Sequence, residues 1–344
     1  MKAIIIGSGM AGLTSAATLA QAGVSVTIFE QYSQVGGVTA HFEHGGYHWD
    51  LGQLVIEGMG ENEPGGSIFA SLGVLENVKT RLEDRGYIFP DFELRKPKEY
   101  QGTTWRIEKL KQLFPKESRG LDRYWQDFKR VMRVMTFGRR LDQSHGLASL
   151  WLKARLYLSL LPVLGKLNWS AQRLMDDYFT SDELKMVFMS ILADFATRPD
   201  QFLGLGVFAL NQEAVYDKRM PAKLGKDTEM LYHYSVLGGI GCLTDALVEK
   251  IEELGGKIYT NQAVEKIKVE DGKAVGVIDS LGQYWDADVI VASGGARELF
   301  VDMVGAEYLP ADFIEHVKKI PLMCSVLMIH LGVDFDPSPY LHDV

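Results

Sequence analysis

The sequence predicts an α/β fold: a parallel-sheet domain interrupted by a largely helical α+β domain. Three observations support this prediction. The chain opens with an apolar strand pattern, a glycine turn and a helical pattern. Its middle carries long amphipathic helical patterns, and a second glycine-rich turn near residue 238 introduces another helix and alternating strands. A length of 344 residues suits two domains.

The composition is that of a folded protein. Hydrophobic residues make up 47% and charged residues 24% of the chain, which argues against disorder. The net charge of −9 argues against a general nucleic-acid binder. Cys242 and Cys324 form no CxxC pair, so neither a disulfide framework nor a cysteine zinc site is indicated. We expect a cytoplasmic protein without a signal peptide or a transmembrane helix.

The first elements predict a dinucleotide-binding unit. An apolar strand over residues 3–6 precedes a GxGxxG turn over residues 7–12, and the following helix is expected to stop at Gly23. A second strand over residues 24–29 leads to Glu30, whose carboxylate would accept a hydrogen bond from a ribose hydroxyl. An acid here disfavours an NADP 2′-phosphate, but it does not distinguish NAD from FAD.

A second glycine pair distinguishes between NAD and FAD as the cofactor. Gly36-Gly37-Val38-Thr39 precedes the segment GYHWDLG over residues 46–52. Together they resemble the extended N-terminal signature of flavoproteins that bind FAD across two glycine-rich loops. The chain resembles the phytoene desaturase, carotenoid isomerase and retinol saturase group within the amine-oxidase-like flavoprotein superfamily. Many relatives have an arginine where this chain has Val38, and its absence favours the isomerase-like and saturase-like branches.

The returning glycine segment fits the same resemblance. Gly238-Gly239-Ile240-Gly241 precedes a helix with Leu243, Leu247, Ile251 and Leu254 on one face. We infer no second nucleotide site, because no clear strand leads into this loop and the family uses such a helix to re-enter the FAD domain. The resemblance implies that the backbone of Val264 holds the adenine, and that Ser293 and Gly294 lie in a loop near the cofactor.

The resemblance therefore implies FAD as the cofactor and a defined set of contact residues. The second glycine pair would lie against the diphosphate and ribityl chain, and Gly52 and Gln53 would approach the flavin. The predicted cofactor-binding residues are Gly7, Ser8, Gly9, Met10, Ala11, Gly12, Glu30, Gln31, Gly36, Gly37, Val38, Thr39, Gly52, Gln53, Val264, Ser293 and Gly294.

The middle of the chain indicates a substrate domain. Strand-like patterns cover residues 87–89 and 103–107, and an apolar stripe at helical spacing then predicts a core-facing helix. The stripe consists of Leu121, Tyr124, Trp125, Phe128, Met132 and Met135. Between Arg119 and Lys166 there are ten Lys or Arg side chains and three Asp side chains, a local charge of +7.

That basic window contains an apolar, aromatic segment over residues 150–164, interrupted by Lys153 and Arg155. Two interpretations remain open. The segment is either a helix in a membrane interface or a buried helix pair at the entrance of a substrate tunnel. Peripheral membrane contact is therefore one expectation for this chain.

His41, His44 and His48 fall within eight positions. A metal site is disfavoured, because no fourth ligand has suitable spacing and Gly45-Gly46 predicts a hairpin turn between them. A histidine beside the flavin edge is the preferred interpretation. No Ser-His-Asp arrangement stands out, and we assign no catalytic residue.

We expect the FAD-binding domain to comprise residues 1–86 and 233–298, and the substrate domain to comprise residues 87–232 and 299–344. In the last part, residues 324–331 are expected to form a strand of the substrate-domain sheet. Relatives continue well beyond the position of Val344 with a glycine-containing segment that closes over the flavin. The chain is therefore a fragment, or a partner completes the site, or cofactor binding is compromised.

The function implied by the resemblance is that of an FAD-dependent oxidoreductase acting on an apolar, unsaturated lipid such as a carotenoid or retinoid. It would desaturate, saturate or isomerise this substrate. Two alternatives remain: an amine-oxidase-like flavoenzyme with another substrate, and a non-catalytic FAD-binding partner subunit. A soluble NAD dehydrogenase is the least favoured enzyme.

Overall fold

A computed structural model describes residues 1–52, 55–99, 104–142, 144–223, 227–322 and 325–336. The chain divides into two compact units. Unit 1 contains Met1–Arg81, Tyr234–Leu322 and the described residues from Met328 onward, and unit 2 contains Leu82–His233 and residues 325–327. Because unit 2 is inserted into unit 1, the chain enters unit 1 twice. The predicted α/β fold class is confirmed.

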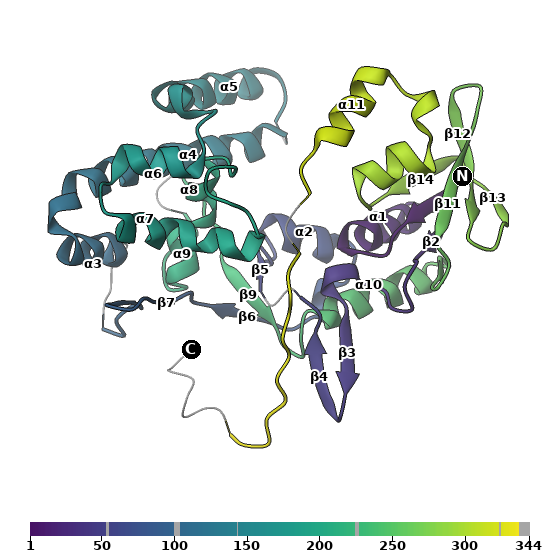
Figure 1. Ribbon diagram of the computed structural model, residues 1–344, viewed down its shortest axis with the longest axis horizontal. Coiled ribbons are helices and arrows are strands. Elements are labelled where there is room, and N and C mark those ends of the chain that lie inside the picture. The colour runs from purple at the N-terminus through teal and green to yellow at the C-terminus, as the bar shows by residue number, and fades with distance from the viewer. Residues whose placement is uncertain (53–54, 100–103, 143, 224–226, 323–324, 337–344) are drawn as a thin grey trace. The chain divides into compact units, whose positions relative to one another are not determined.

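The centre of unit 1 is a parallel four-stranded sheet (Figure 1). In sheet order its strands are β10 (Lys257–Tyr259), β2 (Ser25–Phe29), β1 (Lys2–Ile6) and β14 (Val289–Ala292). Buried β-branched residues suit such a strand, and Ile5 of β1 is 0% exposed. Helices α1 (Met10–Gln21) and α10 (Gly241–Glu253) pack against each other beside this sheet. Parallel strands end at one edge, so the turns that follow β1, β2 and β14 lie close together.

A smaller antiparallel sheet packs against the parallel strands. Its strands are β11 (Val264–Glu270), β12 (Lys273–Asp279) and β13 (Tyr284–Asp286). Ile4, Ile6 and Phe29 share a hydrophobic cluster with Val264 and Val277. This cluster fixes the start of β11 beside the ends of β1 and β2.

Unit 1 also contains a hairpin, and a second small sheet lies where the chain leaves and re-enters unit 1. The hairpin joins β3 (His41–His44) to β4 (Tyr47–Asp50) through Gly45 and Gly46, whose φ angles of 60° and 82° explain the two-residue turn. The small sheet has the order β5 (Ile56–Glu57), β9 (His233–Val236) and β6 (Thr80–Glu83). The remaining helical elements are η1 (Gly37–Thr39), α2 (Pro64–Ser71), η2 (Leu75–Asn77), η6 (Glu298–Met303), η7 (Ala306–Tyr308) and α11 (Ala311–Lys319).

Unit 2 is largely helical. Its elements are β7 (Tyr87–Ile88), β8 (Glu93–Leu94), α3 (Trp105–Leu113), η3 (Pro115–Glu117), α4 (Ser118–Asp142), α5 (Gly146–Leu160), η4 (Leu161–Lys166), α6 (Ala171–Tyr178), α7 (Asp182–Met189), η5 (Ser190–Phe195), α8 (Gly206–Leu210) and α9 (Glu213–Tyr216). The predicted stripe on α4 faces the core, since Leu121, Tyr124, Phe128 and Met132 are buried. Trp125 packs at the edge of this cluster.

Three expectations for the second domain need correction. Residues 105–107 are helical, because α3 begins at Trp105 and buries Trp105 and Leu110. Residues 325–331 form no strand, since no neighbouring strand pairs with them among the described residues; Cys324 lies outside these residues. Residues 299–322, expected in the substrate domain, belong to unit 1, because Leu299 and Met303 pack against its hydrophobic cluster.

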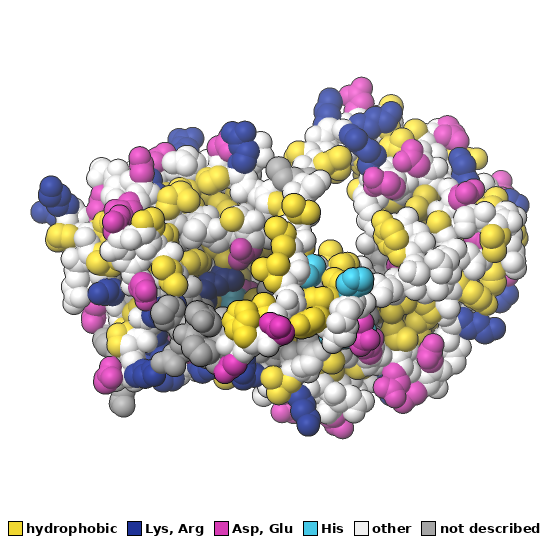
Figure 2. Space-filling model, turned by 60° about the horizontal axis from the view of Figure 1, so that its bottom comes forward, with side chains coloured by type: hydrophobic (Ala, Val, Ile, Leu, Met, Phe, Trp, Pro, Cys, Tyr) yellow, Lys and Arg dark blue, Asp and Glu magenta, His cyan; other side chains and the backbone are white. Residues whose placement is uncertain are grey.

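The surface mixes charge signs. Lys and Arg side chains are interspersed with Asp and Glu side chains on the face shown in Figure 2, with hydrophobic side chains exposed between them. The chain has a net charge of −9. The mixed charges on this face differ from the continuous basic stripe that a nucleic-acid-binding face has.

Candidate cofactor site

The first glycine turn lies between β1 and α1, and its glycines differ in their surroundings. Gly7 has a φ of +92°, which favours glycine. A Cβ added at Gly12 would lie 2.1 Å from the Gly7 carbonyl oxygen, so only glycine fits there. A Cβ added at Gly9 would meet no described atom within 4 Å. Gly12 therefore serves the packing of helix on strand, while Gly9 borders open space.

The N-terminus of α1 faces that open space. Gly9 is its N-cap, no described side chain caps this end, and its first turn has no acidic residue. The first N–H groups of a helix have no partner inside the helix and carry partial positive charge. This end of α1 therefore suits a phosphate. Met10 is half-buried and Ala11 is exposed in the first turn.

The second glycine loop lies directly against the first. Gly36 N–H donates to the Ser8 carbonyl at 2.9 Å, and a Cβ added at Gly37 would lie 3.3 Å from the Gly9 Cα. The Thr39 hydroxyl lies 3.0 Å from that of Thr244 on α10, which braces the loop. The structure thus brings together the two loops that the resemblance implies. Val38, in the place of the relatives' arginine, is 71% exposed.

Glu30 directly follows β2 and lies beside the first turn. Its Oε2 accepts from Ser8 N–H at 2.9 Å and from the Ser8 hydroxyl at 2.6 Å, and its Oε1 accepts from Tyr32 N–H at 3.0 Å. A carboxylate offers about four acceptor positions, so Glu30 retains capacity for a ribose hydroxyl. The sequence did not predict that Ser8 would anchor this carboxylate. Gln31 is exposed next to it.

Residues from the second stretch of unit 1 contact the first glycine turn and Glu30. The Ser293 hydroxyl follows β14 and lies 3.1 Å from the carbonyl oxygens of both Ile6 and Gly7, so it holds the first turn in place. A Cβ added at Gly294 would meet no described atom within 4 Å. Gln262 N–H donates to the Glu30 carbonyl at 2.9 Å. Val264, two residues further on, is buried at the start of β11.

Asp50 has a role that the sequence analysis missed. Its carboxylate accepts from the N–H groups of Ile240 and Gly241 at 3.0 and 3.2 Å, and so occupies the N-terminus of α10. The expectation that no strand leads into this loop was wrong, because β9 ends at Val236. That strand belongs to a different sheet from β1, and Asp50 already fills the anion position.

The final predicted contacts are only partly described. A Cβ added at Gly52 would lie 3.3 Å from the Val38 carbonyl oxygen, which places Gly52 beside the second glycine loop. Gln53 lies outside the described residues. The predicted helix face of α10 is buried at Leu243, Leu247 and Ile251, whereas Leu254 follows the helix and is 38% exposed.

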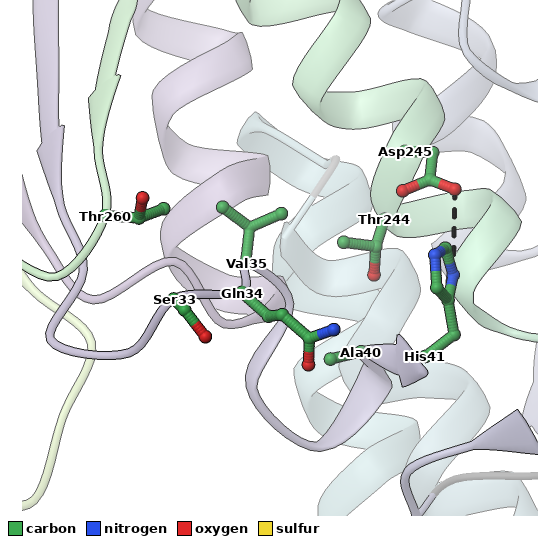
Figure 3. Close-up of a pocket in the computed structure, with 8 residues that line it drawn as sticks. All are labelled: Ser33, Gln34, Val35, Ala40, His41, Thr244, Asp245 and Thr260. Carbon is green, nitrogen blue, oxygen red and sulfur yellow. Dashed lines mark ion pairs between the residues drawn. The ribbon is translucent and has the colours of Figure 1, made fainter. Parts of the chain in front are cut away.

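A cavity of about 240 Å³ lies next to this site (Figure 3). Its lining residues are Ser33, Gln34, Val35, Ala40, His41, Thr244, Asp245 and Thr260. The Nδ1 of His41 lies 3.7 Å from the Asp245 carboxylate. This volume is below the roughly 300–1,000 Å³ of typical small-molecule pockets, so the cavity alone does not account for a dinucleotide site. Of these eight residues, His41 is one of the three histidines for which a place beside the flavin edge was the preferred interpretation, and the other seven were not predicted as cofactor contacts.

Comparisons with known proteins identify a family for this chain. Residues 10–333 match the family model described as flavin containing amine oxidoreductase. Prolycopene isomerase 1 of an Oncidium hybrid cultivar is 25% identical over 341 residues, covering 96% of this chain and 54% of that protein. A 4,4′-diapophytoene desaturase of Methylomonas is 22% identical over 344 residues, covering 96% of this chain and 61% of the relative.

Solved structures show the same fold. An oxidoreductase from Methanosarcina mazei aligns with a TM-score of 0.60 at 22% identity, covering 93% of this chain and 65% of that one. Putrescine oxidase bound to putrescine aligns with a TM-score of 0.59 at 17% identity, covering 92% of this chain and 63% of that one. The chain thus spans just over half to about two thirds of the length of these proteins.

Proposed function

Because the chain belongs to the flavin containing amine oxidoreductase family, we propose that it holds FAD across its two glycine loops and acts on an apolar polyene lipid. The predicted family, the α/β fold class and the flavin cofactor are confirmed. The contact residues and the substrate are the proposed part.

The observation that carries the proposal is the contact between the two glycine loops beside open space. Gly36 is hydrogen-bonded to Ser8, Gly37 lies against Gly9, and Gly9 borders a volume free of described atoms. In this arrangement the backbone N–H groups at the start of α1 would hold the diphosphate. Glu30 would accept from a ribose hydroxyl. Val38 has no positive charge. Backbone N–H groups would therefore stabilise the negative charge of the diphosphate without help from an arginine at that position.

The proposed chemistry needs few protein groups. Bound FAD supplies hydride transfer at its flavin ring. The chain contributes cofactor orientation through Glu30, Ser293 and the glycine loops, and we assign no catalytic side chain. Support for a polyene substrate comes from the relatives, which are named as a prolycopene isomerase and a diapophytoene desaturase.

The substrate class is tested by offering FAD-loaded protein a carotenoid polyene and, separately, putrescine. We expect a shift of the polyene absorption bands, identified as altered unsaturation or geometry by chromatography, and no change in flavin absorbance with putrescine. Bleaching of the flavin by putrescine while the polyene stays unchanged would contradict the proposal and assign the chain an amine substrate.

A further inference from the structure

The outer face of α5 and η4 is apolar where a soluble helix is usually polar. We call this surface the α5 face and define it by Leu147, Leu150, Trp151, Tyr157, Leu158 and Leu161. Their exposed fractions range from 57% to 85%. Spacings of three, four and seven residues place these side chains on one side of the helical segment. The α5 face is therefore a continuous apolar ridge with two aromatic side chains.

The helix carrying this ridge lies along unit 2. Gly146–Lys166 is long and apolar enough to span a membrane by length and composition, with mean hydropathy 1.4 and only 11% of the segment buried. No such helix was expected, because the chain has no stretch of about 18 apolar residues without a charge; Lys153 and Arg155 interrupt this one. Its other side packs against α4 (Figure 1), burying Leu152 and Val163. A helix held to its own domain in this way suits an orientation in the membrane plane.

A basic cleft lies at the edge of the ridge. Arg130, Arg133 and Arg155 line a cleft of about 260 Å³ together with Leu158, Ser159 and Pro162. Leu158 thus belongs to both the ridge and the cleft. The cleft therefore presents guanidinium groups and a hydroxyl directly beside exposed apolar side chains.

The three arginines differ in charge compensation. Arg130 pairs with Asp127 at 2.7 Å, and Arg155 pairs with Asp227 while stacking on Trp151 at 4.6 Å. Arg133 donates to the Lys129 carbonyl at 3.3 Å and pairs with no carboxylate among the described residues. Lys153 is likewise exposed on α5. These two cations are available to an anion.

We propose that the α5 face docks on the surface of an anionic phospholipid bilayer, with a lipid phosphate in the arginine cleft. Arginine matches the geometry of phosphate oxygens, and exposed Trp, Tyr and Leu side chains insert at the level of the headgroups. Most cations between Arg119 and Lys166 are paired with carboxylates, so the charge that complements such a bilayer comes from Arg133 in the cleft and Lys153 on α5. The observations that carry this proposal are separate from those that carry the proposed function.

Cosedimentation with vesicles tests the charge component. The purified chain should bind phosphatidylcholine vesicles containing phosphatidylglycerol more tightly than phosphatidylcholine vesicles alone. The variant Arg133→Glu/Lys153→Glu should bind the anionic vesicles roughly 25-fold more weakly, at about fivefold for each cation. The matched control Lys109→Glu/Lys116→Glu carries the same charge change on exposed positions of α3 and η3 and should keep its affinity. Equal losses in both variants would overturn the proposal.

A second pair of variants tests the ridge. Leu150→Gln/Leu158→Gln should lose binding to both kinds of vesicle, whereas Ile88→Gln/Leu281→Gln, which are 62% and 76% exposed elsewhere, should not. All four leucine and isoleucine positions are exposed, so thermal unfolding should be unchanged. The proposal would be overturned if the wild type bound no vesicles but formed a dimer, and Leu150→Gln/Leu158→Gln were monomeric. That result would assign the ridge to contact with a second copy of the chain.

Discussion

Single glycines in the first turn have separable roles. A Cβ at Gly12 would collide with the Gly7 carbonyl, whereas a Cβ at Gly9 has room. We expect Gly12→Ala to lower the free energy of unfolding by about 1–3 kcal/mol, the usual cost of overpacking. Gly9→Ala should change it by less than about 0.5 kcal/mol. Urea unfolding of both variants measures this difference, and equal losses would contradict it.

A buried ion pair lies in the core of unit 2. The Nη1 of Arg106, which is 1% exposed, donates to Glu213 at 3.0 Å, and its guanidinium lies 3.9 Å from the ring centroid of Tyr216. Burial raises the pKa of Glu213 against the opposing attraction of Arg106. Glu213→Gln should cost about 3–5 kcal/mol in urea unfolding, because it leaves a buried guanidinium uncompensated.

The apolar double variant separates charge from packing. Arg106→Met/Glu213→Leu should recover much of the stability lost in Glu213→Gln, since removing both charges leaves neither unpaired. A double variant less stable than Glu213→Gln would show that the ion pair itself supplies the stability of this core.

At the scale of elements, Asp279 fastens the antiparallel sheet beside Val264. Its carboxylate accepts from Gln262 Nε2 at 2.6 Å, from Trp285 Nε1 at 2.7 Å and from the N–H groups of Leu281 and Gln283 at 2.9 Å. Burial acts to raise the pKa of Asp279, but these donors outweigh it and hold the pKa below its ordinary value. Its contribution to stability is complete above the unfolded-state pKa of about 3.9 and is lost as pH falls through the folded-state pKa.

We therefore predict that the free energy of unfolding depends less on pH in Asp279→Asn than in the wild type. At neutral pH this variant should lose about 1–3 kcal/mol, and the loss should shrink once the pH is well below about 4. Urea unfolding of the wild type and the variant at neutral pH and at a pH well below about 4 measures this loss. Asp271→Asn, at the hairpin tip with a φ of 48° that asparagine tolerates, serves as the neutral-pH control. A constant loss at both pH values would be inconsistent with this role for Asp279.

Elements with local causes were predictable from the sequence, and those with distant causes were not. The β1–α1–β2 unit follows from its glycine turn and apolar periodicity, and α4 follows from its stripe. Residues 325–331 have an apolar strand pattern, but a strand requires a neighbour, which the pattern does not specify. Asp50 and Ile240, which the cap joins, lie 190 positions apart. The sequence shows the acidic residue but not that it binds the N-terminus of α10.

Across the whole molecule, the candidate site is assembled from stretches that unit 2 separates along the chain. The glycine loops and Glu30 were predictable because their residue types are tied to backbone geometry and phosphate binding. The cavity beside Thr260 and His41 was not, because apart from His41 its lining residues belong to no recognised motif. The role of Ser8 was also hidden, since many residue types fit the second position of a GxGxxG turn.

The central claim is that FAD binds at the open space beside Gly9. The most direct test is the visible spectrum of the purified chain, with the released cofactor identified after denaturation, in the wild type, in Gly9→Leu and in the control Gly138→Leu. Both glycines border space free of described atoms within 4 Å of an added Cβ, and circular dichroism checks that both leucine variants fold. The account predicts bound FAD in the wild type and in Gly138→Leu, and its loss in folded Gly9→Leu. Full FAD retention by Gly9→Leu, or no FAD uptake by the folded wild type from excess cofactor, would contradict it.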